Sequence, residues 1–274
     1  MNIDKNIEEH QDEFEHAEAK EISEDIAMYR TLVSNIYMVG NPSNESWVLI
    51  DTGVAQYHER ILVAAQRRFP DTPPKAIILT HGHFDHVGSA KALAKYWDVP
   101  IYAHQEELPY LNGSLAYPPV DPTVGGGLIS LISPLFPKKP IQLSKWLQPI
   151  TKELENTLLD GWTIIHTPGH TPGHISLFKE KDRVLIAGDA VATENPESAL
   201  AMFFPIGKIY GPPAFFTENW DLAKQSVEHI IKLRPKLLLA GHGLPMEGDS
   251  LEKGLEHLIT NFEEIAIPKH KKNK

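Results

Sequence analysis

Four apolar segments of this 274-residue chain share one pattern, and that pattern constrains the fold more than any other feature. Each is a short run with high strand propensity that leads, through small or turn-forming residues, into a histidine or an aspartate. The four are AIILT before His81, WTIIHTPG before His170, RVLIAG before Asp189 and KLLLAG before His242. Since open α/β sheets gather such residues at the carboxyl ends of their strands, we predict one polar site at a sheet edge.

The first segment leads into four potential metal ligands within six residues. The run is His81-Gly-His83-Phe-Asp85-His86, in a loop that is expected to leave a strand. Solvent-facing histidines are the alternative interpretation, but a loop this dense in imidazole and carboxylate groups favours a metal site. The chain has no cysteine, which excludes thiolate ligands and a thiolate nucleophile. Any metal must therefore bind to nitrogen and oxygen atoms.

The succession of strand and helix patterns predicts one mixed α/β domain. Strands are expected at residues 32–39, 47–50, 76–79, 101–103, 162–166, 175–178, 184–187 and 237–240. Apolar residues recur with helical spacing at residues 56–69, 88–97 and 219–233. A last helix is expected to begin with a capping box at Asp249-x-x-Glu252.

Most of the charge of the chain lies at its start. Residues 1–28 hold ten acids and two lysines, which is −8 of the formal net charge of −10. We interpret them as an acidic extension, either a solvated helix or a flexible lead-in. The domain is expected to span residues 29–268, followed by a basic tail at 269–274. Within it, residues 109–149 carry eight prolines and the run Gly125–Gly127, which suggests an irregular, lid-like insertion.

Composition argues against two classes of partner. The body of the chain is close to neutral, so it lacks the basic surface expected of a nucleic-acid-binding protein. The longest apolar stretch, Val124–Phe136, is interrupted by glycine and proline and is too short to span a membrane. The first residues lack the apolar core of a signal peptide, so we expect a cytoplasmic protein.

The motifs HGHFDHVG, TPGH, AGD and AGHG, in this order, resemble those of the metallo-β-lactamase-fold hydrolases. The resemblance runs from about residue 29 to the end of the chain. It implies a four-layer αββα sandwich with a two-metal site at one edge and the Pro/Gly-rich insertion near that site.

The resemblance also implies a role for each matching residue. The implied ligands are, for the first metal, His81, His83 and His170, for the second, Asp85, His86 and His242, and, as a bridge, Asp189. Asp51, in LIDTG, would support the ligand loop by hydrogen bonding. Such a ligand count leaves room for a shared water, as an open catalytic site needs.

A site of this kind predicts hydrolysis of a small-molecule substrate. Two divalent ions lower the pKa of a bridging water, so that a metal-bridged hydroxide can attack a polarised carbonyl at neutral pH. Asp85 would be the catalytic residue that orients the hydroxide and later carries its proton. Zinc suits these ligands best, and iron and manganese are the alternatives.

The segment Met202–Phe216 is rich in aromatic residues and proline. It is expected either to line the substrate pocket, together with residues 109–149, or to pack on the core or on a partner chain. The candidate substrate contacts in it are Phe203, Phe204 and Tyr210, the last as a hydroxyl that assists an oxyanion.

Two further histidines lie near the predicted ligands. His174 is expected to support them through hydrogen bonds rather than to bind metal itself. His166 is expected to lie in the core or to have the same supporting role.

Single residues separate the branches of the family. The lack of cysteine excludes β-lactamases with a thiolate ligand, and Asp189 argues against the all-histidine β-lactamases. Ala192 stands where acyl-homoserine-lactone lactonases place a tyrosine. Only 32 residues follow His242, which is short for the helical region of glyoxalase-II-like thioesterases.

We therefore expect a dinuclear hydrolase that cleaves an ester, a thioester or a lactone and acts as a monomer or a homodimer. The alternatives are a quorum-type lactonase, an iron-dependent persulfide dioxygenase and a non-catalytic metal-binding module.

Overall fold

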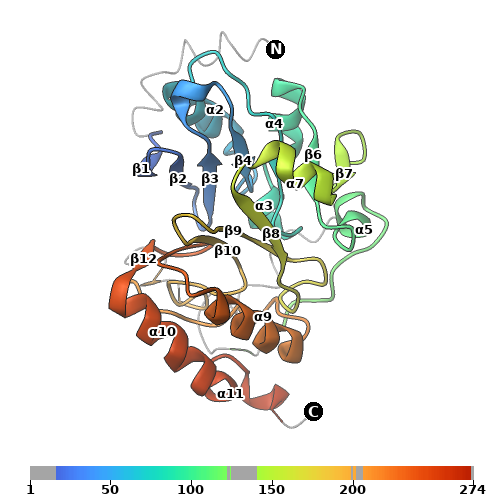
Figure 1. The fold of residues 1–274 in the computed structure, drawn as a ribbon. Coiled ribbons are helices and arrows are strands. Elements are labelled where there is room, and N and C mark those ends of the chain that lie inside the picture. Colours follow the sequence, from blue (N-terminus) through green and yellow to red (C-terminus); the bar gives the residue numbers. More distant parts are fainter. Residues whose placement is uncertain (1–16, 122–123, 125–140, 199, 202–205, 273–274) are drawn as a thin grey trace.

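Two β-sheets face each other and carry helices on their outer sides, in a computed structural model of the chain (Figure 1). The structure describes residues 17–121, 124, 141–198, 200–201 and 206–272. None of the helices within these residues combines the length and apolar composition that a membrane-crossing helix needs.

The first sheet has seven strands in chain order, β1 to β7. Its first four strands pair antiparallel, and β4 to β7 pair in parallel. The strands are Lys20–Ser23, Ile26–Arg30, Asn35–Val39, Val48–Ile50, Ile77–Ile78, Ile101–Ala103 and Leu147–Pro149.

The second sheet has five strands in the order β12-β11-β10-β9-β8. Only β10 and β11 pair in parallel, and the other neighbours are antiparallel. From β8 to β12 the strands are Trp162–His166, Ile175–Lys179, Val184–Gly188, Leu237–Ala240 and Met246–Glu247.

Alternating side chains of the strands supply three separate cores. Ile26 and Met28 of β2 face the second sheet, whereas Ala27 and Tyr29 face the helices outside the first. The central core also contains Leu177 of β9 and residues of β10 and β11. Because helices cover the outer face of each sheet, the inner strands such as β3, β4 and β10 are buried along their whole length. The predicted four-layer αββα sandwich is confirmed.

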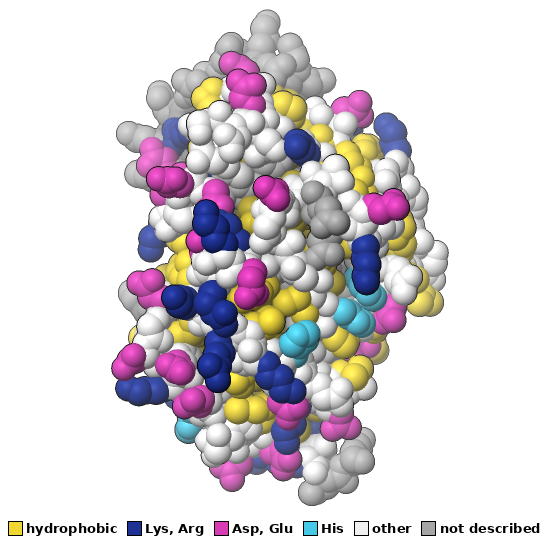
Figure 2. Space-filling model, viewed as in Figure 1, with side chains coloured by type: hydrophobic (Ala, Val, Ile, Leu, Met, Phe, Trp, Pro, Cys, Tyr) yellow, Lys and Arg dark blue, Asp and Glu magenta, His cyan; other side chains and the backbone are white. Residues whose placement is uncertain are grey.

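The outer layers are amphipathic helices. Helices α2 (His58–Arg68) and α4 (Ala90–Trp97) cover the first sheet, and α9 (Trp220–Leu233) and α10 (Gly248–Thr260) cover the second (Figure 1). The shorter helices are α3 (Phe84–Val87), α5 (Leu108–Leu111), α7 (Lys152–Leu158) and α11 (Phe262–Ile265). Lys and Arg side chains are interspersed with Asp and Glu on the face in Figure 2, in keeping with a nearly neutral body.

The expected helices and most expected strands form close to their predicted bounds, but the predicted capping box is wrong. Helix α10 begins at Gly248, one residue before Asp249, and its N-cap Glu247 makes no side-chain capping bond. Asp249 instead lies inside the first turn, where it pairs with Lys253 at 3.2 Å.

The interpretation of residues 1–28 as a helix or a flexible lead-in is wrong for its last part. Strand β1 and most of β2 lie within this range and pair with each other at the edge of the first sheet. Arg68 of α2, which is nearly buried, ties them to the domain. Its guanidinium donates to the Glu21 carboxylate at 2.8 and 2.9 Å and to the carbonyls of Glu24 and Gly40.

The predicted insertion at residues 109–149 is described only in part. Its last three residues form β7, which pairs in parallel with β6, so they belong to the sheet rather than to an irregular segment. Residues 122–123 and 125–140 of the predicted lid lie outside the described residues.

Replacing Arg68 tests whether β1 and β2 are part of the cooperative unit. Arg68→Ala should lower the free energy of unfolding by about 2–3 kcal/mol, because buried carbonyls lose a charged donor. Glu21→Gln should cost less than about 1 kcal/mol, since the Glu21 side chain is 60% exposed. Urea unfolding followed by circular dichroism measures both values, and equal losses would contradict this account.

Candidate metal centre

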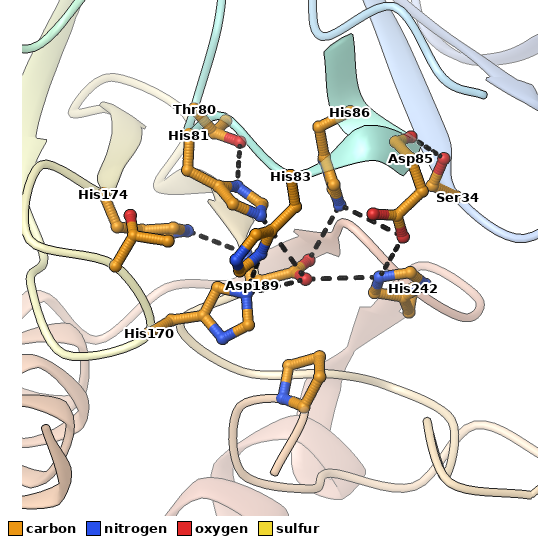
Figure 3. Close-up of polar contacts among 12 residues, drawn as sticks. Ser34, Thr80, His81, His83, Asp85, His86, His170, His174, Asp189 and His242 are labelled. Carbon is orange, nitrogen blue, oxygen red and sulfur yellow. Dashed lines mark hydrogen bonds and ion pairs between the residues drawn. The ribbon is translucent and has the colours of Figure 1, made fainter. Parts of the chain in front are cut away.

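The predicted ligands converge at one edge of the sandwich, where strands of both sheets end (Figure 3). The loop after β5 carries His81 and His83, and the short helix α3 that follows it carries Asp85 and His86. The loop between β8 and β9 carries His170. Asp189 directly follows β10, and His242 follows β11. Backbone bonds from Ile175 to Thr80 (3.0 Å) and from Asn35 to Gly241 (2.8 Å) join the two sheets at this edge.

All seven predicted ligands lie close together and are buried. Their ligand atoms fall into three groups, within each of which every atom lies within 4.8 Å of the others. The groups are His81, His83 and His170, then His81, His86 and Asp189, then Asp85, His86 and His242.

Asp189 joins the histidines of the two predicted metal sites. Its Oδ2 lies 3.4 Å from His170 Nε2 and 3.2 Å from His242 Nε2. Its Oδ1 lies 3.5 Å from His86 Nε2. This central position agrees with the bridging role that the sequence predicts.

Hydrogen bonds on the outer side of the rings orient four of the histidines. In each ring Nδ1 contacts an oxygen atom of the surrounding structure, which leaves Nε2 facing the centre. The contacts are His81 with Thr80 Oγ1 (3.0 Å), His86 with Asp51 Oδ2 (2.8 Å), His170 with Thr217 Oγ1 (3.1 Å) and His242 with the Val33 carbonyl (2.8 Å). Metal-binding histidines are typically held in this way, because the outer bond fixes both the tautomer and the ring orientation.

Three buried polar atoms of the centre have no hydrogen-bond partner among the residues that the structure describes. They are His81 Nε2, His86 Nε2 and Asp189 Oδ1. A buried polar atom without a partner is costly, and such atoms are rare in folded proteins. Their convergence on one point is what a bound cation would compensate, so these residues fit a metal site.

Asp51 forms hydrogen bonds with the run of predicted ligands. It follows β4 with a left-handed backbone (φ 60°), and its carboxylate accepts hydrogen bonds from Thr80 N and Thr80 Oγ1, both at 2.7 Å. The same carboxylate contacts His86 Nδ1. One side chain therefore fixes both ends of the His81 to His86 run.

His174 supports Asp189. Its Nε2 accepts a hydrogen bond from Asp189 N at 2.9 Å, and its Nδ1 lies 2.9 Å from Thr167 Oγ1. Burial lowers its pKa to about 4, so the ring is neutral and can accept this bond. Gly188 (φ 53°) makes room for the contact, because a Cβ there would lie 2.6 Å from His174 Nε2.

His166 is not in the core, which corrects that part of the prediction, and its Nε2 contacts the Pro172 carbonyl in the loop of His170 at 2.9 Å. Its ring is exposed and stacks on His104 with the centroids 4.1 Å apart and the planes at 13°. Together with Glu106 the two rings form a further group of possible ligands. Ring lone pairs lie in the ring planes, however, so two nearly parallel stacked rings do not point at one common ion.

Without bound ions, the histidines of the centre form two groups. The pKa is lowered for His81, His83 and His170 and raised for His86 and His242. Burial lowers the pKa of His81 and His170 well below the usual value and that of His83 to about 3. Burial also opposes a charge on His242, but the Asp189 and Asp85 carboxylates raise its pKa to about 9. The same carboxylates, with Asp51, raise the pKa of His86 despite its burial.

Several residues near the centre were not predicted individually. The Tyr117 and Phe216 rings lie against His83, with centroids 4.7 and 4.3 Å away. Both residues belong to segments that the sequence suggested as pocket walls. The buried carboxylate of Glu107 contacts Tyr117 and Gly82 beside the same histidine. No motif marks Glu107, and only the glycines beside the predicted ligands hinted at a close neighbour.

The three predicted substrate contacts have different outcomes. Phe203 and Phe204 lie outside the described residues. The half-buried Tyr210 pairs with Ala192 through its backbone, and Lys208 lies over its ring. Among the described contacts of Tyr210, none is to a predicted ligand, so its role stays a prediction.

Comparisons with known proteins agree with the fold and the centre. The sequence profile of the metallo-β-lactamase superfamily matches residues 29–242, and the chain belongs to this superfamily. The chain is 42% identical over 235 residues to the Bacillus subtilis protein named "Probable metallo-hydrolase YflN", which covers 85% of this chain and 89% of that protein.

Solved structures are similar at lower identity. The BLEG-1 B3 metallo-β-lactamase has a TM-score of 0.55 and 26% identity, over 78% of this chain and 88% of that one. TTHA1623, solved in a di-iron-bound form, has a TM-score of 0.52 and 26% identity, over 80% of this chain and 92% of that one. With the ligand groups above, these relatives identify the class as a metal-dependent hydrolase.

Metal binding should release protons near neutral pH. His242 has a pKa of about 9 without ions, so it is charged at pH 7.5 and must lose its proton to bind a metal. Affinity should therefore rise as the pH increases towards 9. In the ion-free protein this charge stabilises the fold below the unfolded-state pKa of about 6.5, and the contribution is lost as the pH rises through about 9.

Calorimetric titration of the ion-free chain with Zn²⁺ at pH 7.5, in two buffers of different ionisation enthalpy, measures the number of protons. We expect the release of about one proton or more per chain. The same apparent enthalpy in both buffers, together with an affinity independent of pH, would contradict the assignment of His242 as a ligand.

Proposed function

We propose that the chain is a dinuclear metal-dependent hydrolase that cleaves an ester, a thioester or a lactone of a small acyl substrate. The observation that carries the proposal is the position of Asp189 between two groups of histidines, with three unpartnered polar atoms around it. A mononuclear centre, as in a persulfide dioxygenase, would not need the group of Asp85, His86 and His242.

Zinc is the metal that the proposal favours. All seven ligand side chains offer nitrogen or oxygen, which suits zinc but also iron or manganese. The di-iron form of TTHA1623 keeps iron open as an alternative. Two divalent ions, when bound, supply a water molecule that is activated at neutral pH and polarise a substrate carbonyl.

Asp85 is proposed to hold and transfer the proton of the reaction at its Oδ2 atom. This oxygen lies 3.4 Å from His242 Nε2 and 3.8 Å from His86 Nε2. Burial raises the pKa of Asp85, which makes its carboxylate a better proton acceptor than an exposed one. Its backbone carbonyl accepts a hydrogen bond from Ser34 Oγ, which holds the residue in place.

Aromatic side chains beside the centre favour a substrate with an apolar acyl group. Tyr117 and Phe216 lie against His83, and Tyr110 stacks on Tyr117 with centroids 4.1 Å apart. These rings offer apolar surface beside a predicted metal ligand. A hydrolase relative, the hydroxyacylglutathione hydrolase GloC of Haemophilus influenzae, is 34% identical over 119 residues, 43% of this chain and 50% of that one. This relative is the reason to include thioesters among the candidate substrates.

The purified protein should contain about two metal ions per chain and hydrolyse at least one of the three substrate classes. Elemental analysis gives the metal content, and p-nitrophenyl esters, thioesters and lactones are assayed with and without a chelator. Removing the ions should abolish turnover, and adding zinc should restore it. Turnover that resists a chelator which strips the ions would contradict the proposal.

Asp189→Ala should lose metal and activity together, because both ligand groups lose their shared carboxylate. We expect fewer than about half of the ions to remain and turnover to fall by at least about 100-fold. Asp160→Ala is the matched control, since Asp160 is an exposed aspartate outside the ligand groups. Full activity in Asp189→Ala would remove the bridging role.

A further inference from the structure

Glu107 lies between the two loops that carry His83 and His170. The residue follows β6 and immediately precedes α5, and its side chain is completely buried. Backbone bonds at both its amide and its carbonyl fix its position, from Glu107 N to His104 O and from Tyr110 N to Glu107 O. A carboxylate in such a place is costly unless hydrogen bonds compensate it.

Each carboxylate oxygen of Glu107 binds one of the two loops. Oε1 accepts hydrogen bonds from Thr171 Oγ1 at 2.6 Å and from Gly173 N at 2.8 Å, both in the loop of His170. Oε2 accepts from Gly82 N at 3.0 Å, between His81 and His83, and from the Tyr117 hydroxyl.

The two glycines allow the loops to approach this carboxylate. A Cβ at Gly173 would lie 2.7 Å from Glu107 N, and one at Gly82 would lie 2.5 Å from the Tyr117 hydroxyl. Both distances are far below van der Waals contact, so larger residues would push the loops away. The same cause therefore explains the central glycine of HGH and the second glycine of TPGHTPGH, namely the close approach of each loop to Glu107 and Tyr117.

Only a carboxylate satisfies both loops at once. The two backbone N–H groups are obligatory donors, and each faces a different oxygen of Glu107. Burial raises the pKa of Glu107, and the hydrogen bonds from Thr171, Tyr117, Gly173 and Gly82 oppose that change. A glutamine would turn an amide N–H₂ group towards one of the two loops, where a donor would face a donor.

The other half of the centre is held by different residues. The Asp85 carbonyl accepts from Ser34 Oγ, the His86 carbonyl accepts from Thr52 Oγ1, and His242 Nδ1 contacts the Val33 carbonyl. Glu107 makes none of these described contacts. The described contacts of Glu107 are therefore to the loops of the group of His81, His83 and His170.

We propose that Glu107 is a positioning residue that holds the loops of His83 and His170 together through hydrogen bonds. It thereby sets the metal affinity of the position formed by His81, His83 and His170. The metal affinity of the position formed by Asp85, His86 and His242 does not depend on it. The inference rests on the proposed function in one respect, which is that the bound ions are the two divalent metal ions proposed above. Tyr117 strengthens this connection, because its hydroxyl contacts both Glu107 and Gly82 while its ring lies against His83.

The first experiment compares Glu107→Gln with the zinc-loaded wild type over a series of chelator concentrations. The chelator concentration that removes one ion should fall by about 10- to 100-fold, and the second ion should leave at the wild-type concentration. Glu106→Gln is the matched control, since it makes the same change of charge at the neighbouring, exposed position. Equal loss of both ions, or of neither, would overturn the proposal.

The second experiment does not depend on metal. Amide hydrogen exchange is measured by NMR on the full-length chain, as purified and after dialysis against chelator. Glu107→Gln should speed exchange at Gly82 and Gly173 by at least about 10-fold in both states, whereas Glu106→Gln should leave it unchanged. Protection that persists at both glycines in Glu107→Gln would also overturn the proposal.

Two milder variants keep the test valid if Glu107→Gln fails to fold. Thr171→Val removes one donor to Oε1 and should speed exchange at Gly173 only, whereas Tyr117→Phe should do so at Gly82 only. The reverse pattern, or unchanged amide exchange in both variants, would contradict the proposal that Glu107 holds the two loops together. If the wild type binds fewer than two ions, the dinuclear function fails, and the exchange data still decide the role of Glu107.

Discussion

A buried carboxylate needs nearby positive charge, and the centre of this protein depends on meeting that need at Asp189. Burial opposes its ionisation, yet His242 and His86 hold its pKa well below the usual value. Asp189 lies at the edge of the sandwich where strands of both sheets end, so the fold itself places the site there. In the ion-free protein, protons on His86 and His242 balance the carboxylates, and bound cations would replace them.

Several ligands of the centre are held from outside by hydrogen bonds from different elements. Asp51 after β4 holds His86 and Thr80, Val33 before β3 holds His242, and His174 at the start of β9 holds the Asp189 amide. Glu107 adds the connection between the loops of His83 and His170. The two sheets therefore fix the positions of the ligand side chains. An open catalytic site needs such support, because a substrate and water exchange in it.

The sequence predicts the buried strands and the polar residues that follow them, for one physical reason. Strands β10 and β11 are covered on both faces, so they form uninterrupted apolar runs, and the turn after each must place its polar residue at the sheet edge. The edge strand β1, KEIS, has no such signal, because exposed strands tolerate charge and the acids around it predict a solvated segment. Glu107 was missed because two of its hydrogen-bond donors are backbone amides, which leave no side-chain motif.

The most direct test of the dinuclear centre is anomalous X-ray diffraction at the zinc edge from crystals of the zinc-loaded protein. The account predicts two peaks on either side of the Asp189 carboxylate, one among His81, His83 and His170 and the other among Asp85, His86 and His242. A single peak, or two peaks that do not share Asp189, would contradict it.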